Sequence, residues 1–506
     1  MAQTYSETNE DARPLQFGNY RIPQSKGLAG LSTGATVLLI VGAVLCVFLV
    51  MLNQWGAAAL VVLLIAVAVG LTVAKDKHGM TLAERLVRRL GWWNTRYTGA
   101  NIYRAGPTGM VPGATNQLPG ISARSRVTEH TDAYGRPFAL IEVPQKGHFT
   151  VVLGSEPDGG GMVDQEQMNR WVSRWGHWLG MLTDEPGLAA ASVTIETAPD
   201  TGFRLARKVN ARMTDDAPGF ARQVMNEAIE MLPTGATTTR AYVAVTFKSV
   251  LRAGGKPRKA EEMGQDLAAR LPAITSSLSG TGAGVATPLT AQQLFETIRV
   301  AYDPAEAALF DQAHAEGRAP QLEWHDCGPQ AHEARWDSYR HDNAVSKSWT
   351  MSLPPRSIIQ ATVLQGLLEP APEIARKRVT MLYRPIDPAR AASLVENDVN
   401  TALFNASTRN RETAHDTRDL RAARATAAEE ASGAGLLNFG MIVTATVWDD
   451  TQLADAEAVV ENLAASARIR LREAFGSQDS TFAAGLPLGV VIPDHMTLPT
   501  SVREAL

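Results

Sequence analysis

Two apolar runs near the N-terminus dominate the pattern of hydrophobic and polar positions. Residues 34–52 and 56–74 carry no charged side chain, and the polar Asn53 and Gln54 separate them. Each run is close to the roughly 20 residues that an apolar helix needs to cross a bilayer. A single straight helix through both runs would be about twice too long. The pattern therefore predicts a transmembrane helical hairpin over residues 27–75, with Asn53, Gln54 and Trp55 at the membrane turn.

Charged residues next to the hairpin set its predicted orientation. Cations lie before the first run and after the second, and the turn between the runs has none; they are Arg13, Arg21, Lys26, Lys75, Lys77, Arg85, Arg88 and Arg89. The positive-inside bias then predicts a two-span protein of the bacterial cytoplasmic membrane, with both termini and the bulk of the chain in the cytoplasm. A cleaved signal peptide is disfavoured, because the apolar stretch has double length and follows a long polar segment.

The segments on either side of the hairpin differ in character. Residues 1–26 are polar and contain Pro14 and Pro23, so a flexible tail is predicted. Residues 76–131 are predicted to hold a helix that begins at the capping box Thr81–Glu84, followed by a Gly/Pro-rich linker. The helix carries arginines together with Trp92 and Trp93, so it lies either on the membrane surface or packed against the rest of the protein.

Strand and helix periods alternate along the remainder of the chain. Strand patterns occur at residues 135–143, 148–153, 189–197 and 238–249, and helical patterns at 164–182, 219–232, 260–278 and 290–301. This order predicts a first cytoplasmic α+β domain over residues 132–304 with a mainly antiparallel sheet. Residues 305–335 show neither period and are predicted to form an irregular connector.

A second α+β domain is predicted over residues 336–506. Its strands are expected at residues 344–353, 376–385 and 439–449, and its helices at 355–368 and 453–475. The helical pattern over residues 388–432 is interrupted by the polar cluster Asn405–Asn410. This interruption predicts two antiparallel helices, a helical hairpin that projects from the sheet.

Two groups of side chains form the candidate interaction surface. Trp171, Trp175 and Trp178 lie on one face of a predicted helix, where the alternative is ordinary core packing. The second group lies on the charged, alanine-rich part of the predicted helical hairpin, where the alternative is a solvated helix face; it consists of Arg418, Arg421 and Arg424.

Charge and cysteine content narrow the classes of function. The net charge of −4 gives no global basic field, so direct nucleic-acid binding is not expected. An adaptor that contacts DNA through Arg204, Arg207 and Lys208, or through the arginine-rich helical hairpin, is kept as an alternative. Cys46 lies inside an apolar run, which makes a disulfide bond to Cys327 unfavourable.

No nucleotide-binding or catalytic motif emerges from the sequence. The segment Gly254–Pro257 lacks the spaced first glycine of a phosphate-binding loop, and Pro257 stands where Ser or Thr would bind magnesium. Nucleophile elbows and zinc-protease motifs are also absent from the sequence. We therefore expect no RecA-like motor domain, no cofactor and no enzymatic activity.

Metal ligands are the remaining chemical possibility. His314, His325, Cys327 and His332 are residue types that bind zinc, but their spacing matches no zinc motif. No metal site is predicted from this spacing. A membrane-tethered, metal-dependent hydrolase built on this loop is kept as an alternative.

The order of short segments resembles an actinobacterial membrane protein family that is encoded beside conjugation genes. After the predicted hairpin the chain has Trp92-Trp93, Tyr103–Gly106, Leu118–Gly120 and Tyr134–Phe138 in that order. The N-terminal part of that family is similar to the small PrgI-type two-span component of type IV secretion systems.

The rest of the chain resembles the N-terminal, non-motor half of the large type IV secretion ATPase. The segments that carry this likeness are Pro288–Thr290, Ala301–Pro304, Trp336, Tyr339–Asp342, Tyr383–Pro385, Phe439–Thr446, Gln478 and Phe482–Gly489. The resemblance implies a membrane-anchored, non-catalytic assembly subunit of a conjugative type IV-like secretion system. Its implied partners are the secretion ATPase, other membrane subunits of the complex, membrane lipid and further copies of the chain.

Subunits of type VII secretion are a second resemblance. The EccE-type subunit also pairs an N-terminal hairpin with an α+β region, and residues Trp171–Gly176 are similar to that family. An EccE-like function is therefore the alternative to the type IV assignment.

Overall fold

The computed structural model describes residues 16–17, 33–73, 80–106, 109, 116–159, 161, 163–200, 209, 212–214, 216–231, 237–250, 255–318, 320–355, 359–408 and 414–496. These residues form an α+β fold around a large antiparallel sheet. The predicted flexible tail lies outside the described residues, apart from β1 (Gln16–Phe17), which pairs with β12 (Ile359–Gln360).

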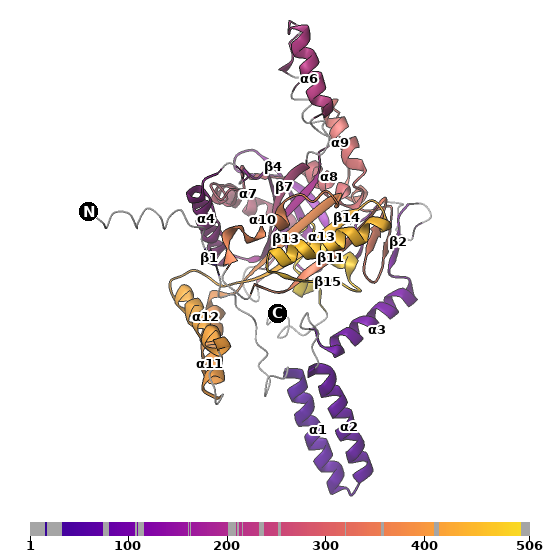
Figure 1. Cartoon of the computed structure of the whole chain (residues 1–506), viewed down its shortest axis with the longest axis vertical. Helices are drawn as coiled ribbons and strands as arrows, with labels where there is room; N and C mark the ends of the chain where they lie inside the picture. Colours follow the sequence, from indigo (N-terminus) through magenta and orange to yellow (C-terminus); the bar gives the residue numbers. More distant parts are fainter. Residues whose placement is uncertain are drawn as a thin grey trace, which may run out of the picture.

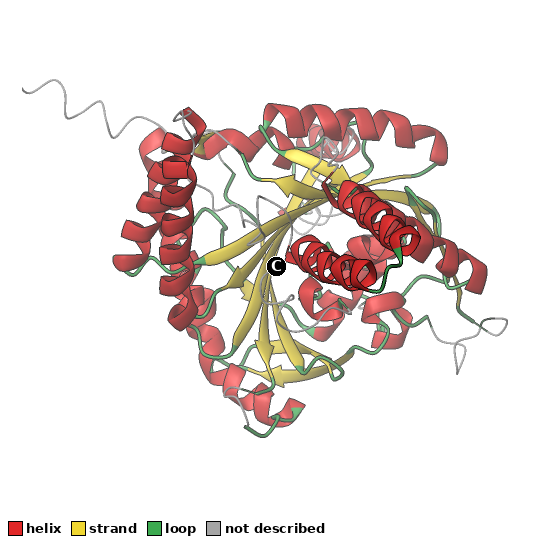
Figure 2. Ribbon diagram, turned by 90° about the horizontal axis from the view of Figure 1, so that it is seen from below, coloured by secondary structure: helices red, strands yellow, loops and turns green. Residues whose placement is uncertain are grey.

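A continuous sheet of 13 strands forms the centre of the protein (Figures 1 and 2). Across the sheet the strands run β2 (Ile102–Arg104), β9 (Ala331–Ala334), β10 (Tyr339–His341), β11 (Ala344–Leu353), β14 (Leu437–Val447), β13 (Arg376–Pro385), β6 (Leu188–Pro199), β7 (Thr237–Lys248), β5 (His148–Ser155), β4 (Pro137–Val143) and β3 (Arg126–Thr131). The short strands β15 (Arg470–Glu473) and β8 (Thr287–Pro288) pair with β11 and β5. The two predicted α+β units therefore share a single sheet.

The sheet contains the same supersecondary unit twice. In the first repeat, the chain order β5, α4 (Gln165–Asp184), β6, β7, α7 (Ala260–Ser277), β8 gives the sheet order β8-β5-β7-β6. In the second repeat, β11, α10 (Gln365–Leu368), β13, β14, α13 (Leu453–Ser466), β15 gives the order β15-β11-β14-β13. Both are the split βαβ arrangement of ferredoxin-like folds.

The two repeats meet along β6 and β13, which we call the seam. These equivalent strands pair antiparallel with Thr194 opposite Thr380, and the two hydroxyl oxygens are 2.9 Å apart. Matching hydroxyl pairs recur in each repeat, Thr150 with Thr246 at 2.9 Å and Ser346 with Thr446 at 2.7 Å. The seam thus relates the repeats by an approximate two-fold axis.

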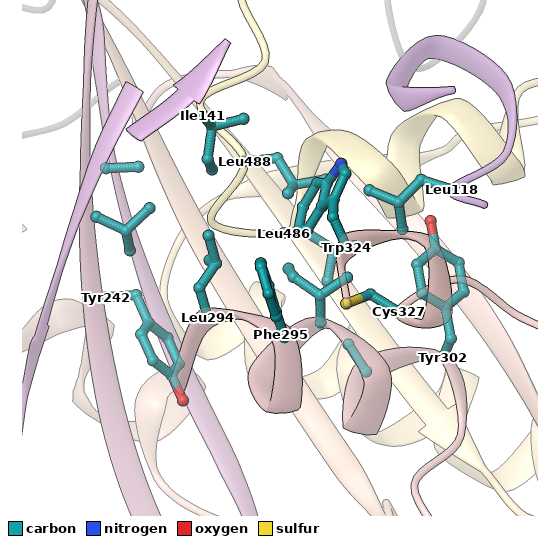
Figure 3. Packing of buried hydrophobic residues seen from close by; sticks show 14 of the residues in the cluster. Leu118, Ile141, Tyr242, Leu294, Phe295, Tyr302, Trp324, Cys327, Leu486 and Leu488 are labelled. Atoms are coloured by element: carbon teal, nitrogen blue, oxygen red, sulfur yellow. The ribbon is translucent and has the colours of Figure 1, made fainter. Parts of the chain in front are cut away.

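Alternation along the strands gives the sheet two buried faces. Val243 and Val245 point to the face covered by α4 and α7, and Val379 and Val443 point to the same face under α10 and α13. The opposite face is covered by α8 (Ala291–Tyr302), α14 (Gln478–Ala484) and the turn η5 (Trp324–Asp326). We call it the α8 face; Figure 3 shows its apolar core.

Residues 485–491, here called the C-terminal strap, lie on the α8 face at the seam. The carbonyl of Gly485 accepts a hydrogen bond from Thr380 at 2.8 Å, and the carbonyl of Gly489 accepts one from Thr246 at 3.1 Å. Thr380 belongs to the second repeat and Thr246 to the first. The strap therefore ties the two repeats together through side chains on both sides of the seam.

The N-terminal apolar runs form α1 (Thr33–Met51) and α2 (Trp55–Val73), which pack together away from the sheet (Figure 1). Asn53 occupies the predicted turn with a φ of 58° and accepts a hydrogen bond from the Trp55 indole at 2.9 Å. Asn tolerates this left-handed conformation better than most residues, which explains the position of the turn.

The prediction that this hairpin spans a membrane is wrong. Within the described residues, no helix combines the length and the apolarity that a membrane crossing requires. The fold class is corrected accordingly, and so is the predicted two-span location in the cytoplasmic membrane.

Helix α3 (Leu82–Thr98) begins at the predicted capping box, in which Thr81 accepts from the Glu84 amide at 3.2 Å. The helix packs against the rest of the protein, which was one of the two predicted positions for it. The Arg89 guanidinium lies 4.6 Å from the ring centroid of Trp336, and Trp92 packs at the edge of the α8-face core.

Each repeat carries an insertion between its second and third strands. In the second repeat this is the helical pair α11 (Pro388–Thr408) and α12 (Ala414–Ala431), with its break near the predicted polar cluster. In the first repeat it includes α6 (Gly219–Met231). Both insertions project from the sheet (Figure 1). The predicted irregular connector instead holds α9 (Glu306–Ala315), η5 and β9. The remaining short helices are η4 (Gly120–Ser122), η6 (Ala361–Leu364), η7 (Asp450–Gln452) and α15 (Ile492–His495).

Candidate functional site

Several guanidinium groups surround one buried carboxylate on the α8 face at the seam. Glu196 of β6 is directly opposite Arg378 of β13 and Arg240 of β7 in the strand register. Arg376 lies two residues from Arg378 and therefore on the same face. We call these four residues the arginine cluster.

Glu196 pairs with both arginines of β13. One carboxylate oxygen bonds to Nη1 of Arg376, and the other lies 3.7 Å from Nε of Arg378. The guanidinium of Arg378 also lies 4.5 Å from the ring centroid of Phe482 in α14, a favourable cation–π distance. The two buried guanidinium groups therefore share a single carboxylate.

Burial leaves part of this positive charge without acceptors. Arg378 is 2% exposed and Arg376 is 9% exposed. Within the described part of the chain, Nε of Arg376 and both Nη atoms of Arg378 have no hydrogen-bond partner. Burial lowers the pKa of Arg378 to about 10, against the opposing effect of Glu196, so this guanidinium stays charged at neutral pH.

A cavity of about 640 Å³ opens beside the arginine cluster. Its walls come from the ends of β5 and β6, the starts of β7 and β13, and helices α8 and α9. Arg376, Glu196 and Tyr242 form buried parts of the wall. The other charged lining residues are Arg240, Glu156, Asp158, Asp200, Glu296 and Asp311.

Tyr242 separates this cavity from the apolar core. Figure 3 shows its ring beside Leu294, with the hydroxyl directed away from Leu488. Burial, with the nearby Glu196 carboxylate, raises the pKa of Tyr242. The neutral phenol can therefore donate a hydrogen bond at the cavity wall. The volume of the cavity is in the range of small-molecule sites.

The lysine between the two arginines of β13 points the other way. Lys377 is buried beneath α10, and its ammonium donates to the Glu369 carbonyl. Burial lowers its pKa to about 8. The sequence contained a signal for this site, because three consecutive cations open the strand that was predicted at residues 376–385. The sequence analysis identified the strand and missed the cations.

The predicted tryptophan group belongs largely to the core on the α4 side. Trp178 is buried, and Trp175 packs on it with ring centroids 4.7 Å apart. Trp175 also contacts Tyr383 across 6.5 Å, and Trp171 lies against Gly282. These side chains therefore stabilise the packing of α4 on the sheet.

The other predicted groups fall in different places. Arg418, Arg421 and Arg424 are exposed on α12, with Arg418 3.2 Å from Asp419. They stay candidates for contact with a partner. Arg204, Arg207 and Lys208 lie outside the described residues.

The predicted histidine and cysteine ligands are dispersed. His314 is exposed and lies 2.9 Å from Glu296, whereas Cys327 is buried and its thiol donates to the Glu323 carbonyl. His332 is buried against the ring of Tyr103 at 5.2 Å. Burial raises the pKa of the Cys327 thiol, which disfavours the thiolate that metals bind.

A lysine already pairs with two of the three carboxylates in an acidic group on the second repeat. In the described part of the chain, the carboxylates close enough to share an ion are Glu457, Glu461 and Glu473. The Lys347 ammonium lies 2.7 Å from Glu457 and 2.8 Å from Glu473. The ammonium thus takes the position in which a metal ion would be held.

Buried imidazoles make the fold sensitive to acid. His341 is fully buried, its Nδ1 faces the Tyr302 carbonyl, and its Nε2 lies 2.8 Å from the Ser346 hydroxyl. The carbonyl fixes the proton on Nδ1, so Nε2 accepts from Ser346. Burial lowers the pKa of His341 to about 3 and that of His332 to about 4.

We expect the free energy of unfolding to fall as the pH drops below about 6.5. Below this pH the histidines of the unfolded chain bind protons. The buried imidazoles of the folded protein stay neutral until the pH approaches their own, lower pKa values. At pH 5 each buried histidine costs about 2 kcal/mol relative to pH 7. Urea titrations between pH 7 and pH 4.5 measure this slope. His341→Gln should flatten it, and the exposed control His314→Gln should not; equal slopes in all three proteins would contradict the assignment.

A known domain family matches the N-terminal part of the chain. Residues 24–84 match a family model described as a domain of unknown function (DUF8461). This match includes α1 and α2 and ends at the start of α3. A comparison with curated protein sequences gave no match. The chain is thus similar to this domain family over the helical hairpin, and the match does not extend to the strands of the sheet.

Proposed function

We propose that this protein is a non-catalytic assembly subunit of a conjugative type IV-like secretion complex, in which it is a platform for the secretion ATPase. The order of the segments that resemble the non-motor half of that ATPase supports the proposal. Several of these segments lie together in the fold. Phe482 of the Phe482–Gly489 segment packs on Tyr339 and His341, with ring centroids 5.1 Å and 4.7 Å apart.

The observation that carries the proposal is the exposure of large apolar side chains on helices outside the sheet. Phe220 on α6 is 79% exposed, and other such side chains lie on α6, α11 and α3: Val224, Met225, Met231, Phe404, Leu86 and Trp93. On α6, Phe220, Val224 and Met231 lie on one face of the helix, and an exposed apolar face marks a protein interaction site. A rigid sheet with apolar projecting helices is suited to holding partner subunits, and this supports assembly over catalysis.

Replacing apolar groups on α6 is expected to weaken ATPase binding. The double variant Phe220→Glu/Met231→Glu should recover at least tenfold less secretion ATPase in a pull-down with purified proteins, because carboxylates cannot be buried in an apolar interface. DNA transfer in the conjugating strain should fall in parallel. Thermal unfolding should stay unchanged, since both side chains are exposed.

Tyr134→Glu is the matched control, because this side chain is 74% exposed on the turn between β3 and β4, away from the projecting helices. It should bind the ATPase like the unmodified protein. Failure of the unmodified protein to bind the type IV ATPase, or its binding to a type VII ATPase in the same assay, would overturn the proposal.

A further inference from the structure

The arginine cluster holds more positive charge than its own carboxylate neutralises. Arg240, Arg376 and Arg378 surround Glu196, so these four side chains together carry a net positive charge, and Asp311 in the cavity lining offsets part of it at Arg240. Two of these guanidinium groups are at least nine-tenths buried, and among the described residues they retain N–H groups without an acceptor. A buried charged donor without a partner is costly, so an unsatisfied one calls for an anionic acceptor.

The cavity lies next to this cluster. Arg376 and Arg240 both line it. Arg378 lies behind Glu196 and adds positive charge at the same wall.

We propose that this wall of the cavity binds the oxyanion group, a carboxylate or a phosphate, of a small ligand. The guanidinium groups of Arg376 and Arg240 hold the oxyanion, and the Tyr242 hydroxyl is a further donor. Planar guanidinium forks match the two oxygens of such groups, and charge-assisted hydrogen bonds are the strong ones. The inference is independent of the secretion proposal.

The remaining lining residues restrict the rest of the ligand. Carboxylates at other parts of the lining, including Glu156 and Asp158, which are exposed, repel additional negative charge. A nucleoside triphosphate, with its several negative charges, is therefore disfavoured. A zwitterion, with one anionic group and a cationic remainder, fits the charge distribution. This points to a peptide-like compound with a free carboxylate.

Isothermal titration calorimetry of the full chain tests the site with three probes. These are the dipeptide glycyl-lysine, its C-terminal amide and inorganic phosphate. We expect the dipeptide to bind and the amide to bind at least tenfold more weakly, because the amide lacks the oxyanion. If phosphate binds and the dipeptide does not, the oxyanion site is supported and its ligand is a phosphate compound. Absence of binding by both would overturn the proposal.

Two variants locate the site. Arg240→Gln changes an exposed side chain and should weaken binding at least tenfold with unchanged thermal unfolding. Arg376→Met should do the same, with circular dichroism showing whether the fold is retained. The control is Arg335→Gln, an arginine that pairs with Glu333 and Asp450 outside the cavity lining. Unchanged binding in Arg240→Gln and in folded Arg376→Met would also overturn the proposal.

Discussion

Glu196→Ala is expected to lower the free energy of unfolding by about 3–5 kcal/mol, because it leaves two buried guanidinium groups without their shared carboxylate. Glu196 bonds to Arg376 and lies 3.7 Å from Arg378, and both arginines are at least nine-tenths buried. The stability lost is the cost of uncompensated buried charge, which exceeds the net contribution of the ion pair itself. Equilibrium denaturation in urea at pH 7 measures it.

Two further variants distinguish the cost of uncompensated buried charge from nonspecific destabilisation of the fold. Removing the charges together, in Glu196→Leu/Arg376→Met/Arg378→Met, should recover most of the lost stability, because apolar replacements leave no charge to desolvate. Glu166→Ala also removes the carboxylate of an ion pair, here the pair with Arg170. The Glu166 side chain is 65% exposed, so the loss of this pair should cost less than about 1 kcal/mol. A triple variant less stable than Glu196→Ala would refute the explanation.

Gly489→Ala is the second substitution with a large expected effect. Gly489 has a φ of 66°, where an L side chain is strained, and an added Cβ would lie 2.3 Å from the hydroxyl oxygens of both Thr150 and Thr246. The left-handed conformation costs about 1–2 kcal/mol, and overpacking adds about 1–3 kcal/mol. We expect the free energy of unfolding to fall by about 3 kcal/mol, because the strap must move off the first repeat.

The matched control for this substitution is Gly176→Ala. Gly176 lies inside α4, where an added Cβ would meet no atom within 4 Å. Alanine there should stabilise the protein by up to about 1 kcal/mol, because glycine is a poor helix former. Thermal and urea unfolding compare the two variants. Similar effects at both positions would mean that the strap does not hold the repeats together as the structure indicates.

Local patterns were good guides to individual elements. The capping box at Thr81 starts α3, the strand predicted at residues 376–385 is β13, and the break near Asn405–Asn410 separates α11 from α12. These features depend on a few neighbouring residues, whose backbone preferences act over short distances. The apolar runs likewise gave the helical hairpin and its turn. Their assignment as membrane spans went beyond what the pattern supported, since no described helix meets the requirement for a crossing.

The repeat and the candidate site were not predicted. The two repeats share the same strand order but show no obvious period in the sequence. One reason is that equivalent helices differ in length, since α4 in the first repeat corresponds to the much shorter α10 in the second. The arginine cluster combines residues from three strands that are far apart in the sequence. Glu196 and Arg376 are separated by 180 positions, and nothing local to either residue identifies the other as its partner.

The sequence by itself determined where many of the helices and strands lie, where the N-terminal helical hairpin turns and which classes of motif are absent from the chain. The tertiary structure alone decided that two units share one sheet, and that Thr194 lies opposite Thr380 at the seam. Strand pairing depends on burying two apolar faces at once, and a shift of one residue would exchange the faces. That collective choice of register, which no short segment encodes, brings Glu196, Arg240 and Arg378 side by side and creates the charged cavity.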